Sequence, residues 1–260
     1  MSEQIYPPSA QFVAKAKLRK ADYDQMYSAS TDNPEEFWME HGKRIDWMTP
    51  YSKVKNVSYS HPDVSIKWFE DGQLNVSANC MDRHLHSRGS QTAIIWESDD
   101  PDISKHITYS ELHKQVCKLS NVYKKLGVKK GDRVVLYLPM VPEAAYAMLA
   151  CARIGAVHSI VFAGFSPEAL ASRIKDCGAS LLVTADEAPR GGRATPLKTN
   201  VDKALGICGD IKTLVVERTN AQVPMHDARD FSYSALMAEA SEDCEPEPMN
   251  AEDPLFILYT

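Results

Sequence analysis

The feature that most constrains the fold is a regular alternation of apolar strands and amphipathic helices between residues 93 and 217. The apolar runs are AIIW (93–96), RVVLYLP (133–139), VHSIVFAG (157–164), LLVTA (181–185) and TLVVE (213–217). Nearly continuous apolar strands separated by helices are typical of parallel sheets that are buried on both faces. The pattern predicts an α/β fold with a doubly wound, mostly parallel sheet and flanking helices.

Local start and stop signals separate these strands. Thr108–Glu111, with the sequence TYSE, matches a capping box, and apolar residues then recur at helical spacing until Gly127. Pro142 and Ser166-Pro167 mark two further helix starts, and glycines follow the corresponding helices. The expected helices cover residues 109–126, 142–154, 167–177 and 196–206.

The first 85 residues are richer in loops. Asn33-Pro34, followed by two glutamates, predicts a helix start ahead of Phe37 and Trp38. Residues 65–80, SIKWFEDGQLNVSANC, alternate apolar and polar side chains around Asp71-Gly72, and they predict a β-hairpin.

The net charge of −6 belongs to one short stretch. Residues 241–254, SEDCEPEPMNAEDP, hold six acidic residues and no Lys or Arg, and the remaining 29 acids match the 29 bases. We interpret this stretch as an acidic linker, and the balanced charge elsewhere does not indicate a nucleic-acid partner.

Cysteine usage and hydropathy indicate a cytoplasmic protein without a membrane partner. The six cysteines contain no CxxC motif and lie mostly in apolar stretches, which favours reduced, buried thiols. The longest apolar run, at residues 144–152, is about half of a membrane span. His84 and His86 lack further ligands at matching spacing, so we interpret them as structural or surface residues and predict no metal site.

Ligands of doubly wound sheets bind beyond the carboxyl ends of the strands, so the loops that follow strands are the candidate sites. Phe162, Ala163 and Gly164 lead from a strand toward a helix start, where small residues let a phosphate approach the backbone. A tight turn that needs small residues is the plainer interpretation of the same stretch.

A second loop carries two arginines. Arg190 and Arg193 flank Gly191-Gly192, so two guanidinium groups can close on one phosphate. The alternative is a solvated loop whose arginines pair with Asp186 and Glu187, and local chemistry favours neither interpretation.

Several stretches together resemble one family, the AMP-forming acetyl-CoA synthetases of the adenylate-forming ligases. The motifs YSEL, GDRV, PMVPE and ACARIGAV occur broadly among adenylate-forming enzymes, whereas NCMDRH, VFAGFSPEAL and PRGGR are more specific to short-chain acyl-CoA synthetases. The resemblance begins near Tyr23 and covers most of the chain.

The resemblance implies that acetate attacks the α-phosphate of ATP, with magnesium offsetting charge, and that the thiol of CoA then displaces AMP to give acetyl-CoA. It implies no catalytic residue in this chain and assigns it part of the CoA site. The residues that it implies for the phosphorylated adenosine end of CoA are Phe162, Ala163, Gly164, Arg190, Gly191, Gly192 and Arg193.

The resemblance also implies a division of the chain. We expect residues 1–85 to wrap an α/β subdomain of residues 86–240 on the CoA side, followed by the acidic linker. Residues 255–260, LFILYT, are expected to form a fully buried strand, the first of a nucleotide-binding half. In the family a lysine-containing loop that binds the phosphates of ATP follows this strand.

We therefore expect an N-terminal fragment that is inactive alone, with the ATP and magnesium sites beyond Thr260 in a missing C-terminal part. One alternative is a synthetase for propionate or another short acid. Another is a non-catalytic CoA-binding or regulatory module, which would bury residues 255–260 within a self-contained sheet.

Overall fold

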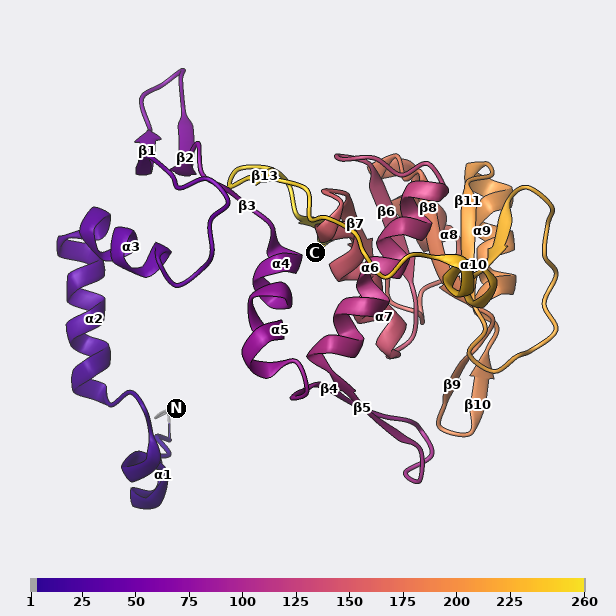
Figure 1. Ribbon diagram of the computed structural model, residues 1–260, viewed down its shortest axis with the longest axis horizontal. Coiled ribbons are helices and arrows are strands. Elements are labelled where there is room, and N and C mark those ends of the chain that lie inside the picture. The colour runs from indigo at the N-terminus through magenta and orange to yellow at the C-terminus, as the bar shows by residue number, and fades with distance from the viewer. Residues whose placement is uncertain (1–3, 260) are drawn as a thin grey trace.

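The computed structural model describes residues 4–259, and its centre is a six-stranded sheet (Figure 1). The strands are β6 (Arg133–Tyr137), β7 (Val157–Ile160), β8 (Leu181–Ala185), β11 (Lys212–Val216), β12 (Asp230–Ser232) and β14 (Phe256–Ile257). They lie in the order β12-β11-β8-β6-β7-β14, and every neighbouring pair is parallel. The predicted parallel sheet is confirmed, but residues 93–96 are not part of it. They lie in β4 (Thr92–Glu97), which pairs antiparallel with β5 (Ser104–Thr108) in a separate hairpin.

Helices flank this sheet on both faces. They are α6 (Tyr109–Lys125), α7 (Pro142–Arg153), α8 (Pro167–Cys177), α9 (Leu197–Cys208) and α10 (Tyr233–Glu239). The helix α6 packs against α7 and α10, whereas α8 packs against α9. The connection from β6 to β7 runs in one direction across the sheet, and the connection from β7 to β8 runs in the opposite direction, past β6. Because both connections are expected to be right-handed, their helices α7 and α8 lie on opposite faces of the sheet. The doubly wound α/β fold is therefore confirmed.

The capping signals lie where the sequence predicts them. Thr108 and Glu111 form the reciprocal capping box of α6, and Gly178 ends α8 with a left-handed φ of 59°. Every residue of β8 is buried, as expected for a central strand that is covered on both faces. Truncation of one such residue, Leu182→Ala, costs about 2–5 kcal/mol by the usual scale for core leucines.

The N-terminal elements lie beside the α/β body (Figure 1). They are α1 (Ala10–Lys15), α2 (Lys20–Asp32), α3 (Pro34–Gly42), β1 (Lys53–Ser58), β2 (Ser65–Glu70), β3 (Gln73–Leu74), α4 (Val76–Cys80) and α5 (Asp82–Arg88). The helices α4 and α5 contact α7 and α6 respectively, whereas α1 and α2 contain no buried residue. The predicted helix after Asn33 is confirmed as α3; residues 1–3 of the expected wrapping segment lie outside the described residues.

The hairpin predicted over residues 65–80 is wrong. Asp71 has a positive φ, and the amide of Gly72 donates to the carbonyl of Phe69, so the chain does turn there. However, β2 pairs with β1, and β3 pairs with β13 (Met249–Asn250). The side chain of Asn75 caps α4 by accepting a hydrogen bond from the amide of Ala78, so the chain enters a helix where the hairpin needs a second strand.

The acidic linker, residues 241–254, is anchored to the body. Asn75, which is fully buried, donates from Nδ2 to the carbonyl of Glu247, and Arg153 donates from Nε to the carbonyl of Cys244. Lys130 lies 3.5 Å from the carboxylate of Glu247. The linker thereby joins α4, the end of α7 and the strand β3.

The expectation of a fully buried strand at residues 255–260 is wrong. Phe256 is 52% exposed and Leu258 is 69% exposed, while Ile257 is partly buried and Thr260 lies outside the described residues. The reason is position, because within residues 4–259 β14 is the last strand of the sheet and pairs with β7 alone. Its second edge and one apolar face are therefore open.

All six cysteines are free thiols, and four of them are buried, as predicted. Within residues 4–259, no helix combines the length and the apolar composition that are needed to cross a bilayer.

Candidate functional site

A pocket of about 500 Å³ opens at the carboxyl ends of the central strands. It is lined by residues 96–99, 138–141, 160–164, 188–190, Thr195 and Arg218. These segments follow β6, β7, β8 and β11, and one further wall comes from the hairpin of β4 (Thr92–Glu97) and β5 (Ser104–Thr108). The chain changes direction between β6 and β8, so the pocket lies at the topological switch point where such sheets bind ligands.

The structure brings the two candidate loops together. Phe162, Ala163, Gly164 and Arg190 line this pocket. Gly191, Gly192 and Arg193 lie immediately beside it in the turn of the hairpin β9 (Ala188–Arg190) and β10 (Arg193–Thr195). Phe162 is 56% exposed, so part of its aromatic surface is available to a planar ligand.

The glycine pair determines how the two arginines are presented. Gly191 and Gly192 have φ angles of 57° and 73°, which a two-residue turn of type I′ requires and which glycine adopts without strain. Arg190 and Arg193 are therefore directly opposite cross-strand partners, and such partners project from the same face of a hairpin. Both guanidinium groups can approach one anion from this face.

The alternative in which these arginines pair with Asp186 and Glu187 is wrong. Asp186 is 2% exposed and accepts hydrogen bonds from backbone amides, including those of Arg218 and Ala221. Glu187 accepts from the hydroxyl of Thr219. Among residues 4–259, neither Arg190 nor Arg193 forms a salt bridge, so their charge remains available to a ligand.

The end of the β4–β5 hairpin forms a wall that the sequence did not indicate. The indole Nε1 of Trp96 donates to the carbonyl of Met140 at 2.8 Å. Asp99 accepts a hydrogen bond of 2.6 Å from the backbone amide of Gly191. These contacts hold the hairpin against two of the loops that line the pocket.

Arg218 is a second group that sequence reasoning missed. Its guanidinium lies 5.1 Å from the centre of the Trp96 ring and donates from Nη2 to Ser98 at 3.2 Å. The available signal was its place directly after the strand TLVVE, at the same edge as the candidate loops.

One other cluster has the composition of a metal site. The side chains of Asp202, His226 and Asp230 approach one another closely. However, Nζ of Lys198 lies 2.7 Å from Asp202 and 2.8 Å from Asp230, and Arg229 contacts both carboxylates. Burial alone would raise the pKa of Asp230, but hydrogen bonds from Arg229 and Lys198 outweigh it and lower this pKa to about 2. The carboxylates are thus neutralised by side-chain cations, which is a structural arrangement.

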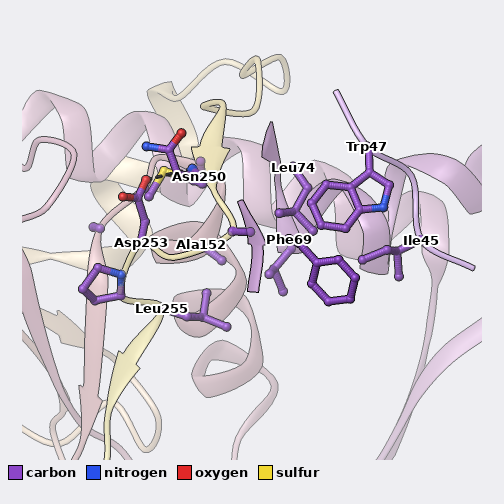
Figure 2. A pocket seen from close by; sticks show the side chains of 14 residues that line it. Ile45, Trp47, Phe69, Leu74, Ala152, Asn250, Asp253 and Leu255 are labelled. Atoms are coloured by element: carbon purple, nitrogen blue, oxygen red, sulfur yellow. Dashed lines mark hydrogen bonds between the residues drawn. The ribbon is translucent and has the colours of Figure 1, made fainter. Parts of the chain in front are cut away.

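A second pocket, of about 230 Å³, lies near the amino end of β7, between the N-terminal elements and the acidic linker (Figure 2). Figure 2 shows Trp47 and Phe69 on one side, and Asn250 and Asp253 on the other. Polar groups of its wall are satisfied within the protein: Trp47 donates to a backbone carbonyl, and Asp253 accepts from the amide of Asn250. The pocket offers mainly apolar surface, so the first pocket is the better functional candidate.

The chemistry of the first pocket is that of binding. It combines an exposed aromatic residue, a glycine at position 164 over which the Phe162 ring packs, and guanidinium groups without carboxylate partners. This combination suits a planar ring that carries phosphate.

Comparison with known families agrees with this class of site. Residues 81–260 match the family model described as AMP-binding enzyme, and residues 23–80 match the model described as acetyl-coenzyme A synthetase N-terminus. The chain therefore belongs to the AMP-binding enzyme family, in the branch that carries this N-terminal domain.

Within this family, the chain is most informatively compared with curated relatives named acetyl-coenzyme A synthetase. The chain is 58% identical over 262 residues to acetyl-coenzyme A synthetase from Marinobacter nauticus, with 99% of this chain covered, and 58% identical over 261 residues to the same enzyme from Parvibaculum lavamentivorans, with 100% covered. It spans 40% of the length of each relative.

Among solved structures, acetoacetyl-CoA synthetase from Streptomyces lividans superposes with a TM-score of 0.83 at 23% identity, over 97% of this chain and 40% of that one. This match supports the fold.

Proposed function

We propose that this chain is the N-terminal part of an AMP-forming acetate–CoA ligase, and that the pocket at the switch point binds the phosphorylated adenosine end of CoA. The observation that carries the proposal is the meeting of Phe162–Gly164 with Arg190 in one pocket, beside the turn that presents Arg193. The identity of 58% to named acetyl-coenzyme A synthetases supports acetate as the acid.

The reaction has two steps. A carboxylate oxygen of acetate attacks the α-phosphorus of ATP and releases pyrophosphate, which gives acetyl-adenylate. The sulfur of CoA then attacks the acyl carbon, loses its thiol proton, and releases AMP. Magnesium would neutralise charge on the phosphates. Within residues 4–259, the cluster of Asp202, His226 and Asp230 does not fit this ion, because Lys198 and Arg229 already neutralise its carboxylates. We assign the ATP and magnesium sites to the remainder of the enzyme.

In this proposal the chain positions CoA for the second step. Arg190 and Arg193 bind the 3′-phosphate, because two guanidinium forks on one hairpin face match the oxygens of a phosphate. The ring of Phe162 lies against the adenine. Gly164 allows this ring to pack over the backbone, because a Cβ at position 164 would lie 2.5 Å from the ring.

The edge strand β14 favours part of a larger enzyme over a self-contained binding module. Phe256 and Leu258 are exposed apolar residues next to an open strand edge. An open strand edge with exposed apolar residues promotes association with other chains, which is unfavourable for a stand-alone module. We propose that the remainder of the ligase covers this surface and that the complete enzyme is cytoplasmic.

The proposal is tested with the complete protein, acetate, ATP and CoA. Acetyl-CoA, AMP and pyrophosphate should form together, and propionate in place of acetate tests the alternative acid. The 260-residue chain alone should form neither acetyl-CoA nor acetyl-adenylate; turnover by this chain would contradict the assignment of the ATP site.

Arg193→Ala in the complete protein tests the CoA site. It should raise the KM for CoA about tenfold or more, because each charge-assisted hydrogen bond contributes about 1.5–3 kcal/mol, and it should leave acetate-dependent exchange of pyrophosphate into ATP nearly intact. Arg44→Ala, a change of an exposed arginine outside the pocket, is the matched control. Equal loss of both activities would place Arg193 outside the CoA step.

A further inference from the structure

Arg218 presents unused hydrogen-bond donors to the pocket. The residue is half-buried and lines the pocket directly after β11. A guanidinium carries five N–H donors. Within residues 4–259, the contact of Nη2 with Ser98 is the one side-chain hydrogen bond that Arg218 makes, and it forms no salt bridge there.

Arg218 is held in place at its backbone and at its guanidinium group. The backbone amide of Arg218 donates to the buried carboxylate of Asp186 at 2.9 Å, and the guanidinium lies against Trp96. The Trp96 ring is itself fixed by its hydrogen bond to Met140. A preorganised arginine loses little entropy when it binds an anion.

The surrounding charges leave room for a ligand anion. Glu97 and Asp99 line the same pocket, but within residues 4–259 neither forms a salt bridge with Arg218, and the carboxylate of Asp99 accepts the amide of Gly191. Nζ of Lys105 lies 5.6 Å from the centre of the Trp96 ring, so two cations gather at this indole. A partly desolvated guanidinium without a counter-ion is unfavourable, and a bound phosphate removes that cost.

The sheet order relates Arg218 to the proposed CoA contacts. The strand β11, which precedes Arg218, is the direct neighbour of β8, which precedes Arg190. Phe162 follows β7, on the other side of β6. The pocket therefore has an aromatic contact toward one end and two arginines toward the other.

We propose that Arg218 is a further specificity-determining residue that binds the 3′-phosphate of CoA together with Arg190. Trp96 and Ser98 orient its guanidinium. This inference rests on the proposed CoA site and deepens it, because it states how the protein distinguishes CoA from its analogue without the 3′-phosphate.

The test compares Arg218→Ala with the wild type in the complete protein, with CoA and dephospho-CoA as alternative acceptors. The KM for CoA should rise about tenfold or more, by the usual strength of charge-assisted hydrogen bonds, while the KM for dephospho-CoA should change less than about twofold. Arg218→Lys retains the charge and should lose less than Arg218→Ala. Arg44→Ala should change neither KM.

Direct binding separates this contact from a purely structural effect. Calorimetry with adenosine 3′,5′-bisphosphate and with adenosine 5′-monophosphate should show that Arg218→Ala weakens binding of the bisphosphate alone. An equal rise in KM for both acceptors would overturn the inference, as would unchanged kinetics with CoA. If the wild type forms no acetyl-CoA, the proposed function itself fails, which is a different result.

Discussion

Asp186 organises the loop that presents Arg218, and Asp186→Asn tests this role. The carboxylate is 2% exposed. Its Oδ1 accepts the amides of Glu187 at 2.7 Å and Arg218 at 2.9 Å, and its Oδ2 accepts the amide of Ala221 at 3.1 Å. Asparagine keeps the shape and one oxygen, but it places an NH₂ donor where Oδ2 now accepts.

The magnitude follows from the lost bonds. Thr219 also donates to Oδ2 from its amide and its hydroxyl, so asparagine disrupts at least two bonds to an ionised acceptor. Each such bond contributes about 1.5–3 kcal/mol, so the loss of two should make local opening of residues 217–221 easier by about 3–6 kcal/mol.

Native-state hydrogen exchange is the assay, because it measures local opening residue by residue. The amides of Arg218 and Ala221 should exchange at least about 100-fold faster in Asp186→Asn, since 1.36 kcal/mol corresponds to a factor of ten. Glu187→Gln is the matched control, because that carboxylate accepts one side-chain bond from Thr219, and it should change exchange less than about threefold. Exchange in Asp186→Asn within threefold of the wild type would refute the reasoning.

Three further predictions concern other parts of the structure. Lys198→Met removes a cation from the buried carboxylate of Asp230 and should lower the free energy of unfolding in urea by about 3–5 kcal/mol; a loss below about 1 kcal/mol would contradict this. His158 is 8% exposed, and burial lowers its pKa to about 4. Because the unfolded state takes up this proton near pH 6.5 and the folded state does not, stability should fall by roughly 2 kcal/mol between pH 7 and pH 5, and His158→Leu should lack that loss. Asp99→Ala should speed exchange of the Gly191 amide at least about tenfold, and an unchanged rate would show that the contact does not hold the hairpin.

Local signals predicted the α/β body because its elements begin and end through short-range interactions. The capping box at Thr108 and the left-handed glycine at Gly178 act within one turn of helix, so neighbouring residues suffice to recognise them. The hairpin around Asp71 failed for the opposite reason. The partners of β2 and β3 are β1 and β13, and β13 lies far along the chain.

The candidate site was predicted only in part from the sequence. The rule that ligands bind beyond the carboxyl ends of parallel strands selected the loops of Phe162 and Arg190, which do line one pocket. Trp96 and Arg218 were missed because the sequence around a single tryptophan or arginine does not show which residue it contacts in the fold. Their stacking depends on the hairpin β4–β5 and the strand β11, which are far apart in the sequence.

The sequence by itself determined the order of strands and helices, the caps that bound them, and the resemblance to AMP-forming acetyl-CoA synthetases. These are properties of residues close together in the chain. Tertiary structure alone decided which strands pair, that Asp186 accepts backbone amides instead of pairing with Arg190 or Arg193, and that Arg218 joins the pocket. Those outcomes depend on distances between segments that are remote in sequence, which are set when the sheet and its flanking helices pack.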